Sequence, residues 1–173
     1  MKELNPEKVK SQSTYKTDGK FYALCVNESK RLLYAGSSDY SVHVLDSSGE
    51  QKEVLDRWKK HENYVTALTY ISREDKQHIV SGSYDHQLIW WDADTGAAQH
   101  CIEAHLGWVR DLTYIPASHQ IVSSGDDMVV RLWDASTGQP IRDMKGHETR
   151  TPQNLDFIVP KLLERAKIPL LSL

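Results

Sequence analysis

A segment of roughly forty residues recurs three times along the chain, and this repetition constrains the fold more than any other feature. The clearest copy ends in IVSSGDDMVVRLWDASTG (residues 121–138), and the earlier copies end in HIVSGSYDHQLIWWDADTG (78–96) and RLLYAGSSDYSVHVLDSSG (31–49). Each ending joins an apolar run, a small acidic turn and a second β-branched or aromatic run, which is typical of a β-hairpin. The repetition therefore predicts a series of similar β-sheet units.

Three kinds of residue keep the same phase in the copies. The turn aspartates are Asp39, Asp85 and Asp127, separated by 46 and 42 residues, and the closing aspartates Asp46, Asp92 and Asp134 repeat both intervals. About half a period away stand His61, His105 and His147, the last in a Gly-His pair. From about Phe21 to His147 the chain resembles the WD-repeat β-propeller family, whose signature is a Gly-His pair followed by a Trp-Asp ending. Repetition in phase makes this resemblance far more specific than a single Trp-Asp pair.

The resemblance implies an all-β fold of propeller blades in an incomplete ring, each blade a sheet of four antiparallel strands. Three blades are expected, at about residues 21–60, 61–104 and 105–147. Turn signals between the apolar runs place their strands at Phe21–Val26, Leu32–Ala35, Ser41–Leu45 and about Lys52–Trp58; at Val65–Ile71, His78–Ser81, Gln87–Trp91 and Ala97–Ile102; and at Val109–Tyr114, Gln120–Ser123, Val129–Trp133 and about Pro140–Met144. A loop at Ser72–Gln77 is expected to be two residues longer than its counterparts.

The two ends of the chain depart from the repeat. Residues 1–20 are a polar lead-in, in which Val9–Tyr15 could add an outer strand. Residues 148–173 form an atypical tail, whose pattern predicts a short strand at Leu155–Val159 and a helix at Lys161–Lys167. Propellers close with about four to eight blades and three are visible here, so three alternatives stay open. The chain is a fragment of a longer propeller, two copies join their open faces, or the apolar tail covers one face.

Composition narrows the class of partner. The chain is 39% hydrophobic and 26% charged, as soluble globular chains are, and its net charge is −3. Binding to nucleic acids or acidic membranes requires clustered Lys and Arg, so neither is expected as a partner. No run approaches the ~20 apolar residues of a membrane span. Cys25 and Cys101 lie in different repeats, and a reduced, cytoplasmic location is the expectation.

One set of side chains recurs at the blade period and admits two interpretations. Ser81, His61 and Asp85, and then Ser123, His105 and Asp127, could be mistaken for hydrolase triads. A catalytic triad occurs once, whereas these sets recur together with Trp91 and Trp133. In the WD-repeat family the matching residues form buried chains of hydrogen bonds, which implies Trp91–Ser81–His61–Asp85 and Trp133–Ser123–His105–Asp127. We therefore expect a structural network, with a hydrolase as the less favoured alternative.

The first repeat lacks this set. Leu45, Ala35 and Thr17 stand where the Trp, Ser and His would be, so Asp39 is expected to lack those partners and the first blade to be the least rigid. The eight histidines include no HExxH pair, and no Cys-x-x-Cys motif is present. The Ser-Gly turns lead into strands and not into helix N-termini, which bind phosphate. No metal or other cofactor is expected.

The resemblance also implies a partner-contacting surface at one rim of the propeller. In the family, such positions lie three and five residues after the repeat histidine and one before the turn aspartate. Here they are Tyr64, Thr66 and Tyr84; Trp108, Arg110 and Asp126; and, in the repeat without the histidine, Lys20, Tyr22 and Ser38. Tyr, Trp and Arg are enriched at interface hot spots, although Tyr64 and Trp108 could merely cover blade edges. We expect a non-catalytic scaffold that binds a protein or peptide at this rim, the alternative being a purely structural portion of a larger propeller.

Overall fold

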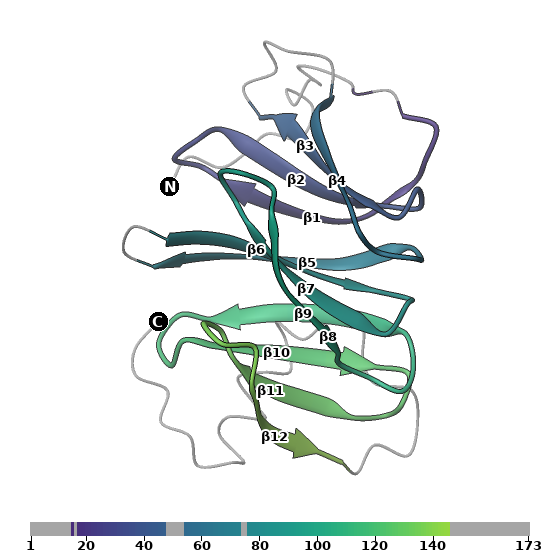
Figure 1. The fold of residues 1–173 in the computed structure, drawn as a ribbon, viewed down its shortest axis with the longest axis vertical. Helices are drawn as coiled ribbons and strands as arrows, with labels where there is room; N and C mark the ends of the chain where they lie inside the picture. Colours follow the sequence, from purple (N-terminus) through teal and green to yellow (C-terminus); the bar gives the residue numbers. More distant parts are fainter. Residues whose placement is uncertain (1–14, 16, 48–53, 74–75, 146–173) are drawn as a thin grey trace, which may run out of the picture.

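Three antiparallel sheets, one per repeat, make up the computed structural model, which describes residues 15, 17–47, 54–73 and 76–145. Within these residues there are twelve strands, and Figure 1 shows them in three successive groups of four. The first group is β1 (Phe21–Asn27), β2 (Leu32–Ser37), β3 (Ser41–Asp46) and β4 (Val54–Lys59). The second is β5 (Val65–Arg73), β6 (Lys76–Ser83), β7 (Gln87–Asp92) and β8 (Ala98–Glu103). The third is β9 (Val109–Ile115), β10 (Gln120–Gly125), β11 (Val130–Asp134) and β12 (Pro140–Met144).

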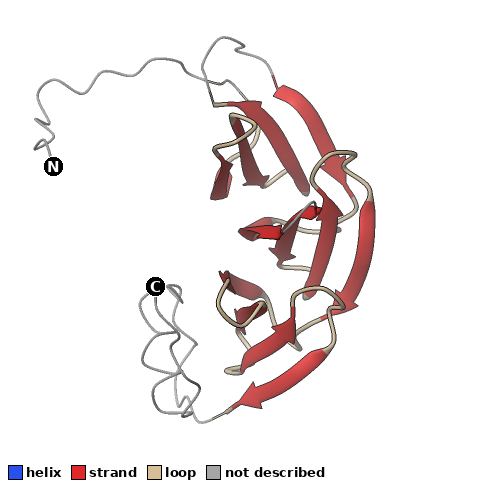
Figure 2. Cartoon of the chain, turned by 90° about the vertical axis from the view of Figure 1, so that its left-hand side faces the viewer, coloured by secondary structure: helices blue, strands red, loops and turns tan. Residues whose placement is uncertain are grey.

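In each sheet the spatial order of the strands follows their order in the sequence. We call the three sheets blade 1, blade 2 and blade 3. Figure 2 shows them side by side in an open arc. The expected all-β class, with three four-stranded antiparallel blades, is confirmed.

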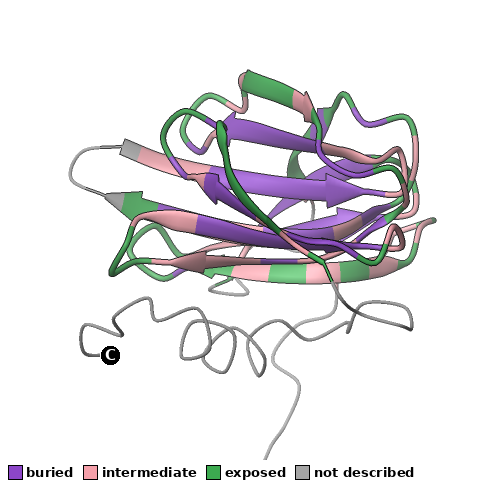
Figure 3. Ribbon diagram, turned by 90° about the horizontal axis from the view of Figure 1, so that it is seen from below, coloured by how far each residue is buried: buried purple, intermediate pink, exposed green. Residues whose placement is uncertain are grey.

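Burial follows the position of a strand within its blade. The second and third strands, such as β2 and β3, are buried along most of their length, whereas the fourth strands β4, β8 and β12 are largely exposed. Figure 3 shows this gradient as purple inner strands and green outer ones. Because the inner strands carry apolar side chains on both faces, each blade needs a neighbour on either side to bury them.

Two apolar seams join the blades. Between blades 1 and 2, Tyr34, Trp58, Ile79 and Trp91 belong to one buried cluster. Between blades 2 and 3, a second cluster includes Trp90 and Trp133. Two glycines let the backbones approach at these seams. A Cβ on Gly36 would lie 2.7 Å from the carbonyl oxygen of Val65, and one on Gly82 would lie 2.6 Å from Cγ1 of Val109.

The strand ends differ from the expectation by one or two residues at most sites, and one loop prediction is wrong. Instead of a loop at Ser72–Gln77, the hairpin ladder continues through the pairs Ser72–Gln77 and Arg73–Lys76. The extra residues of the second repeat therefore lengthen β5 and β6, because their backbone groups pair with one another. The predicted tail strand and helix, most of the lead-in strand Val9–Tyr15 and the first residues of Lys52–Trp58 lie outside the described residues.

Both cysteines are free thiols. Cys25 is half-buried in β1, where burial raises the pKa of its thiol to about 12, and Cys101 is exposed on β8. Among the described residues, no helix is long and apolar enough to cross a membrane.

Candidate functional site

Blade 2 holds a chain of four hydrogen-bonded side chains. The indole Nε1–H of Trp91 donates to Ser81 Oγ at 2.7 Å, and Ser81 Oγ lies 2.7 Å from Nε2 of His61. Nδ1 of His61 is 2.7 Å from Asp85 Oδ2, which also accepts the backbone N–H of Glu62 at 2.9 Å. The chain links β7, β6 and the segment before β5, so it fixes three parts of the blade to one another.

Blade 3 repeats this chain and adds a cation. Trp133 donates to Ser123 Oγ at 2.8 Å, and Ser123 Oγ lies 2.7 Å from Nε2 of His105. His105 Nδ1 is 2.9 Å from Asp127 Oδ1. Arg131, four residues after that aspartate on β11, donates from Nη1 to Asp127 Oδ2 at 2.7 Å. Asp127 therefore has two side-chain partners, a histidine and a guanidinium.

The burial of these sets argues against nucleophilic catalysis. Ser81 and Ser123 are fully buried, and each Oγ already bonds an indole and an imidazole. A catalytic serine must reach a substrate carbonyl, which neither hydroxyl does. The geometry fits a scaffold in which Trp, Ser, His and Asp satisfy one another inside the sheet.

The pKa values of the turn carboxyls agree with this role. Burial raises the pKa of Asp127, but hydrogen bonds from Arg131 and His105 outweigh it and hold the value at about 2. Burial likewise raises the pKa of Asp85, and the bond from His61 outweighs it, so the value falls below the ordinary one. Burial lowers the pKa of His105, against the opposing effect of Asp127. Both carboxyls are ionised near neutral pH.

Blade 1 lacks the chain, as expected from its Leu45, Ala35 and Thr17, and supports its turn aspartate through a local set of bonds that was not predicted from the sequence. Asp39 Oδ2 lies 2.8 Å from Nε2 of His43, and Asp39 Oδ1 accepts the Ser41 hydroxyl at 2.6 Å. His43 occupies the strand position that Arg131 holds in blade 3, and it is fully buried beside the ring of Phe21. The bonds of Ser41 and His43 outweigh burial and lower the pKa of Asp39 to about 2.

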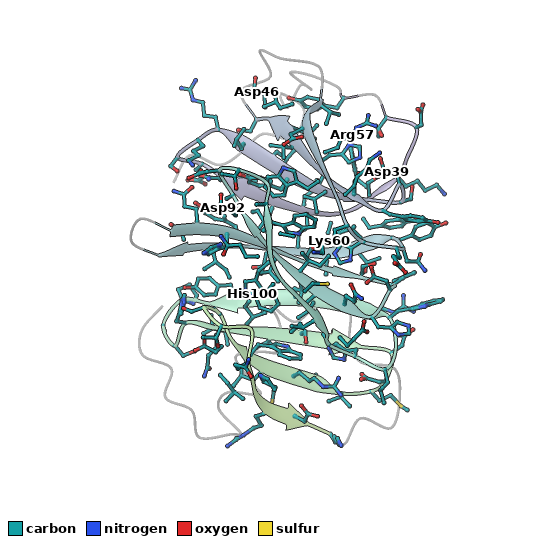
Figure 4. The ribbon with its side chains drawn as sticks, viewed as in Figure 1. Asp39, Asp46, Arg57, Lys60, Asp92 and His100 are labelled. Carbon is teal, nitrogen blue, oxygen red and sulfur yellow. The ribbon has the colours of Figure 1, made fainter. Side chains whose placement is uncertain are left out.

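The b–c turns, which join the second and third strands of each blade, build the rim. The residue before each turn aspartate donates its backbone N–H to the residue three after the repeat histidine or its equivalent. These bonds join Ser38 to Lys20 at 2.9 Å, Tyr84 to Tyr64 at 3.0 Å and Asp126 to Trp108 at 3.0 Å. In Figure 4, Asp39 lies on this side of the arc, while Asp46 and Asp92 lie on the opposite side. The backbone thus brings the predicted rim positions together in pairs.

Four of the rim side chains form a continuous row of rings, which we call the aromatic ladder. Tyr22 stacks on Tyr64 at 5.6 Å between ring centroids, Tyr64 contacts Tyr84 at 5.9 Å, and Tyr84 stacks on Trp108 at 4.3 Å and 11°. The row crosses both seams, since its members come from all three blades. Tyr22, Tyr64 and Trp108 remain more than a third exposed.

Arg110 holds one end of the ladder. Its Nε and Nη2 donate to the two carboxylate oxygens of Asp126 at 2.7 and 2.6 Å, and its Nη1 donates to the Tyr84 hydroxyl at 2.6 Å. Its guanidinium carbon is 5.0 Å from the ring centroids of both Tyr84 and Trp108. The bond to Asp126 raises the pKa of this guanidinium above its ordinary value. Arg110 therefore fixes the stacked pair in place.

Beneath the ladder, the first strands of the three blades line a groove of about 380 Å³. Its lining includes Tyr22, Leu24, Thr66, Tyr84 and Arg110. Thr66, a predicted contact residue, donates its hydroxyl to the carbonyl of Val109 at 2.7 Å, so it also ties blade 2 to blade 3. Lys20 is exposed, and Ser38 accepts its backbone N–H.

One aromatic residue beside the ladder was missed from the sequence. Tyr40 follows the turn aspartate of blade 1, has a φ of 69° and lies 5.8 Å from the ring of Tyr64. His86 and Met128 hold the same turn position with positive φ. The position directly after the turn aspartate was a usable signal, because Tyr40 at this position contacts a ring of the rim.

Known proteins share these repeats. Residues 52–92 and 96–134 match the family model WD40, described as WD domain, G-beta repeat. Nuclear distribution protein PAC1 of Arthroderma benhamiae is 34% identical over 115 residues, covering 63% of this chain and 25% of that protein. WD repeat-containing protein 55 of Pongo abelii is 28% identical over 151 residues, covering 86% of this chain and 37% of that protein. The solved structure of U3-55K has a TM-score of 0.69 at 18% identity, covering 78% of this chain and 42% of that one, which shows a shared fold. The chain thus spans between a quarter and about two fifths of each of these proteins.

Proposed function

Because the chain belongs to the WD40-repeat family, whose members are in general interaction scaffolds, we propose that its rim binds a protein or peptide segment through the aromatic ladder. The observation that carries this proposal is the ladder itself. Stacked, partly exposed Tyr and Trp side chains bury large areas at a low entropic cost, which is the property of interface hot spots. The blades below it hold the ladder in place, and no step of catalysis is involved.

Variants of the purified chain test this function. We expect Trp108→Ala to abolish or strongly weaken the capture of partners from a cell lysate, since Trp108 is 43% exposed at the end of the ladder. Leu55→Ala, at an exposed position on β4 outside the ladder, serves as the matched control and keeps them. Thermal unfolding of both variants shows whether the fold is intact. Identical captured proteins for a folded Trp108→Ala and the wild type would remove the rim from the function.

A second candidate, a portion of a larger propeller, is supported by the outer side of blade 1. Leu24 is 60% exposed on β1, whereas the equivalent Leu68 is 8% exposed because blade 1 covers it. Val26 is exposed in the same way, and its equivalent Tyr70 packs in the seam. We propose that a further blade covers this face, supplied either by a longer protein of which this chain is a portion or by a second copy of the chain. Light scattering on a sizing column distinguishes a discrete dimer from a monomer or aggregates.

A further inference from the structure

Three charged side chains beside the ladder, Arg110, Asp126 and Asp39, are already paired. Both oxygens of Asp126 accept bonds from the Arg110 guanidinium, and the remaining nitrogen of that guanidinium donates to Tyr84. At the blade 1 end, the Asp39 carboxylate is held by His43 and Ser41. Since the charges of these groups are already compensated by their partners, they do not by themselves favour an acidic or a basic segment.

The ring faces are also largely in use. Tyr22 on Tyr64, and Tyr84 on Trp108, are stacked at interplanar angles of 25° and 11°. A cation binds over the negative face of a ring, whereas the outward side of a stacked row presents ring edges and polar tips. The ladder is therefore suited less to a lysine or arginine side chain than to compact apolar groups that pack across successive ring edges.

The ladder and Tyr40 beside it carry N–H and O–H groups that can donate hydrogen bonds to a bound chain. Of the five tryptophans, four donate from Nε1: Trp58 to Asp56, Trp90 to the carbonyl of Ala135, Trp91 to Ser81 and Trp133 to Ser123. Trp108 is the exception, and within the described residues the hydroxyls of Tyr22, Tyr40 and Tyr64 make no hydrogen bond either. The rim thus offers an indole N–H and three phenol O–H groups to a bound chain.

On the basis of the function proposed above, we propose that the aromatic ladder binds an uncharged, proline-containing segment in the polyproline II conformation. Such a segment has no internal hydrogen bonds, so its carbonyl groups are available to the donors of Trp108 and the tyrosines. Its pyrrolidine rings supply compact apolar groups that pack on aromatic side chains. Because the segment is already extended, binding costs little conformational entropy. The groove beneath the ladder accommodates side chains between the prolines.

The test uses the full chain and four capped peptides of about ten residues, a length that crosses the ladder at the ~3.1 Å rise of polyproline II. One is neutral and proline-rich, one has alanine at each proline, and two carry Lys or Glu between the prolines. The readout is the indole N–H resonance of Trp108 in a titration. We expect the neutral proline peptide to shift this resonance, and the alanine peptide to bind roughly tenfold more weakly.

Two variants connect the binding to the ladder. Trp108→Phe keeps an aromatic ring and removes the donor, and we expect it to weaken binding of the proline peptide roughly three- to tenfold. Because this variant lacks the Trp108 resonance, the affinities of the variants are compared by the fluorescence anisotropy of a labelled proline peptide. Leu55→Ala is the control and binds it as the wild type does. Stronger binding of the alanine peptide at Trp108 would overturn the proline class, and stronger binding of the Lys or Glu peptide would overturn the uncharged character of the segment. Either result would leave the rim as an interface. If no peptide shifts Trp108, the proline class fails, and the lysate experiment decides separately whether the rim binds anything.

Discussion

Blade 1 and blade 3 support equivalent turn aspartates in different ways. In blade 3, Asp127 bonds His105 from the segment before β9 and Arg131 from β11, so its contacts link distant parts of the blade. In blade 1, both side-chain partners of Asp39, Ser41 and His43, lie within the same hairpin. A turn can therefore be held by its own hairpin, but only the longer chain of bonds also holds the first strand. We expect blade 1 to be the less rigid end of the described arc.

The largest expected effect comes from removing the carboxylates. Asp127→Ala leaves Arg131 and His105 without their main partner in a nearly buried site, and we expect a loss of about 3–4 kcal/mol of unfolding free energy. Asp39 has a side chain that is 32% exposed, so water replaces part of its contacts and Asp39→Ala costs about 2 kcal/mol. Urea unfolding of both variants measures the difference. Equal losses would mean that the local bonds of blade 1 serve as well as the longer chain.

The next largest effect is the difference in stability between alanine substitutions at two equivalent leucines of the first strands. Leu68 is buried in the seam with blade 1, and Leu68→Ala costs about 3 kcal/mol because it opens a cavity. Leu24 is exposed, and Leu24→Ala changes the stability of the monomer by less than about 0.5 kcal/mol. A large effect at Leu24 in urea unfolding would reveal that this face is covered in solution. Repeating the Leu24 measurement over a range of protein concentrations separates association from a covering segment of the same chain.

A smaller loss of stability is expected from exchanging serine and alanine at the equivalent positions 81 and 35, and both substitutions are expected to destabilise the fold. Ser81→Ala leaves the indole of Trp91 and Nε2 of His61 without a partner and costs about 2 kcal/mol. Ala35 pairs with His43 across the β2–β3 ladder, and Leu45 replaces the Trp of the other blades, so Ala35→Ser buries a hydroxyl without the indole donor and costs about 1–2 kcal/mol instead of stabilising blade 1. Thermal unfolding of the two variants is sufficient. A gain in stability from Ala35→Ser would show that blade 1 already contains acceptors for the added group.

The smallest expected effect concerns the stability of the fold at acidic pH. Asp39 and Asp127 both have pKa values of about 2, below the 3.8 of an unperturbed carboxyl. A carboxyl with a lowered pKa stabilises the fold fully above the unfolded value, and this stabilisation is lost as the pH falls from about 4 toward 2. We expect Asp39→Asn and Asp127→Asn each to reduce the pH dependence of unfolding in this window. If only one of them does so, the pairing of the other aspartate is weaker than the structure shows.

The repeat phase predicted the three blades, and the resemblance to the WD-repeat family implied which side chains form the two networks. Each blade buries a similar hydrogen-bonded set at the same register, so a residue type at a fixed spacing identifies a structural position. The support of Asp39 by His43 was not predicted, because the expectation followed the family pattern and overlooked a histidine four residues after the turn aspartate. Arg131 has the same spacing from Asp127 and gave the same signal.

The residues of the aromatic ladder were predicted from the sequence, but the stacking of their rings on one another was not. Tyr22, Tyr64, Tyr84 and Trp108 were chosen as separate contact residues, but their stacking depends on the distance between neighbouring blades, which no local pattern contains. The pairing of Arg110 with Asp126 and Tyr84 also depends on that distance. The partner-binding role of these residues stays a prediction. The hairpin of β5 and β6 was misjudged because a polar segment, Ser72–Gln77, was taken for a loop although its backbone groups pair.

The two seam glycines have a consequence for the curvature of the molecule. Gly36 and Gly82 lie on second strands and face the first strand of the next blade, where even one added carbon would meet Val65 or Val109. A side chain there would wedge the inner parts of adjacent blades apart while leaving the outer strands unchanged, so the arc would become flatter. The absence of a single methyl group at each seam thus sets the angle between blades, and with it the radius of any ring that these blades help to form.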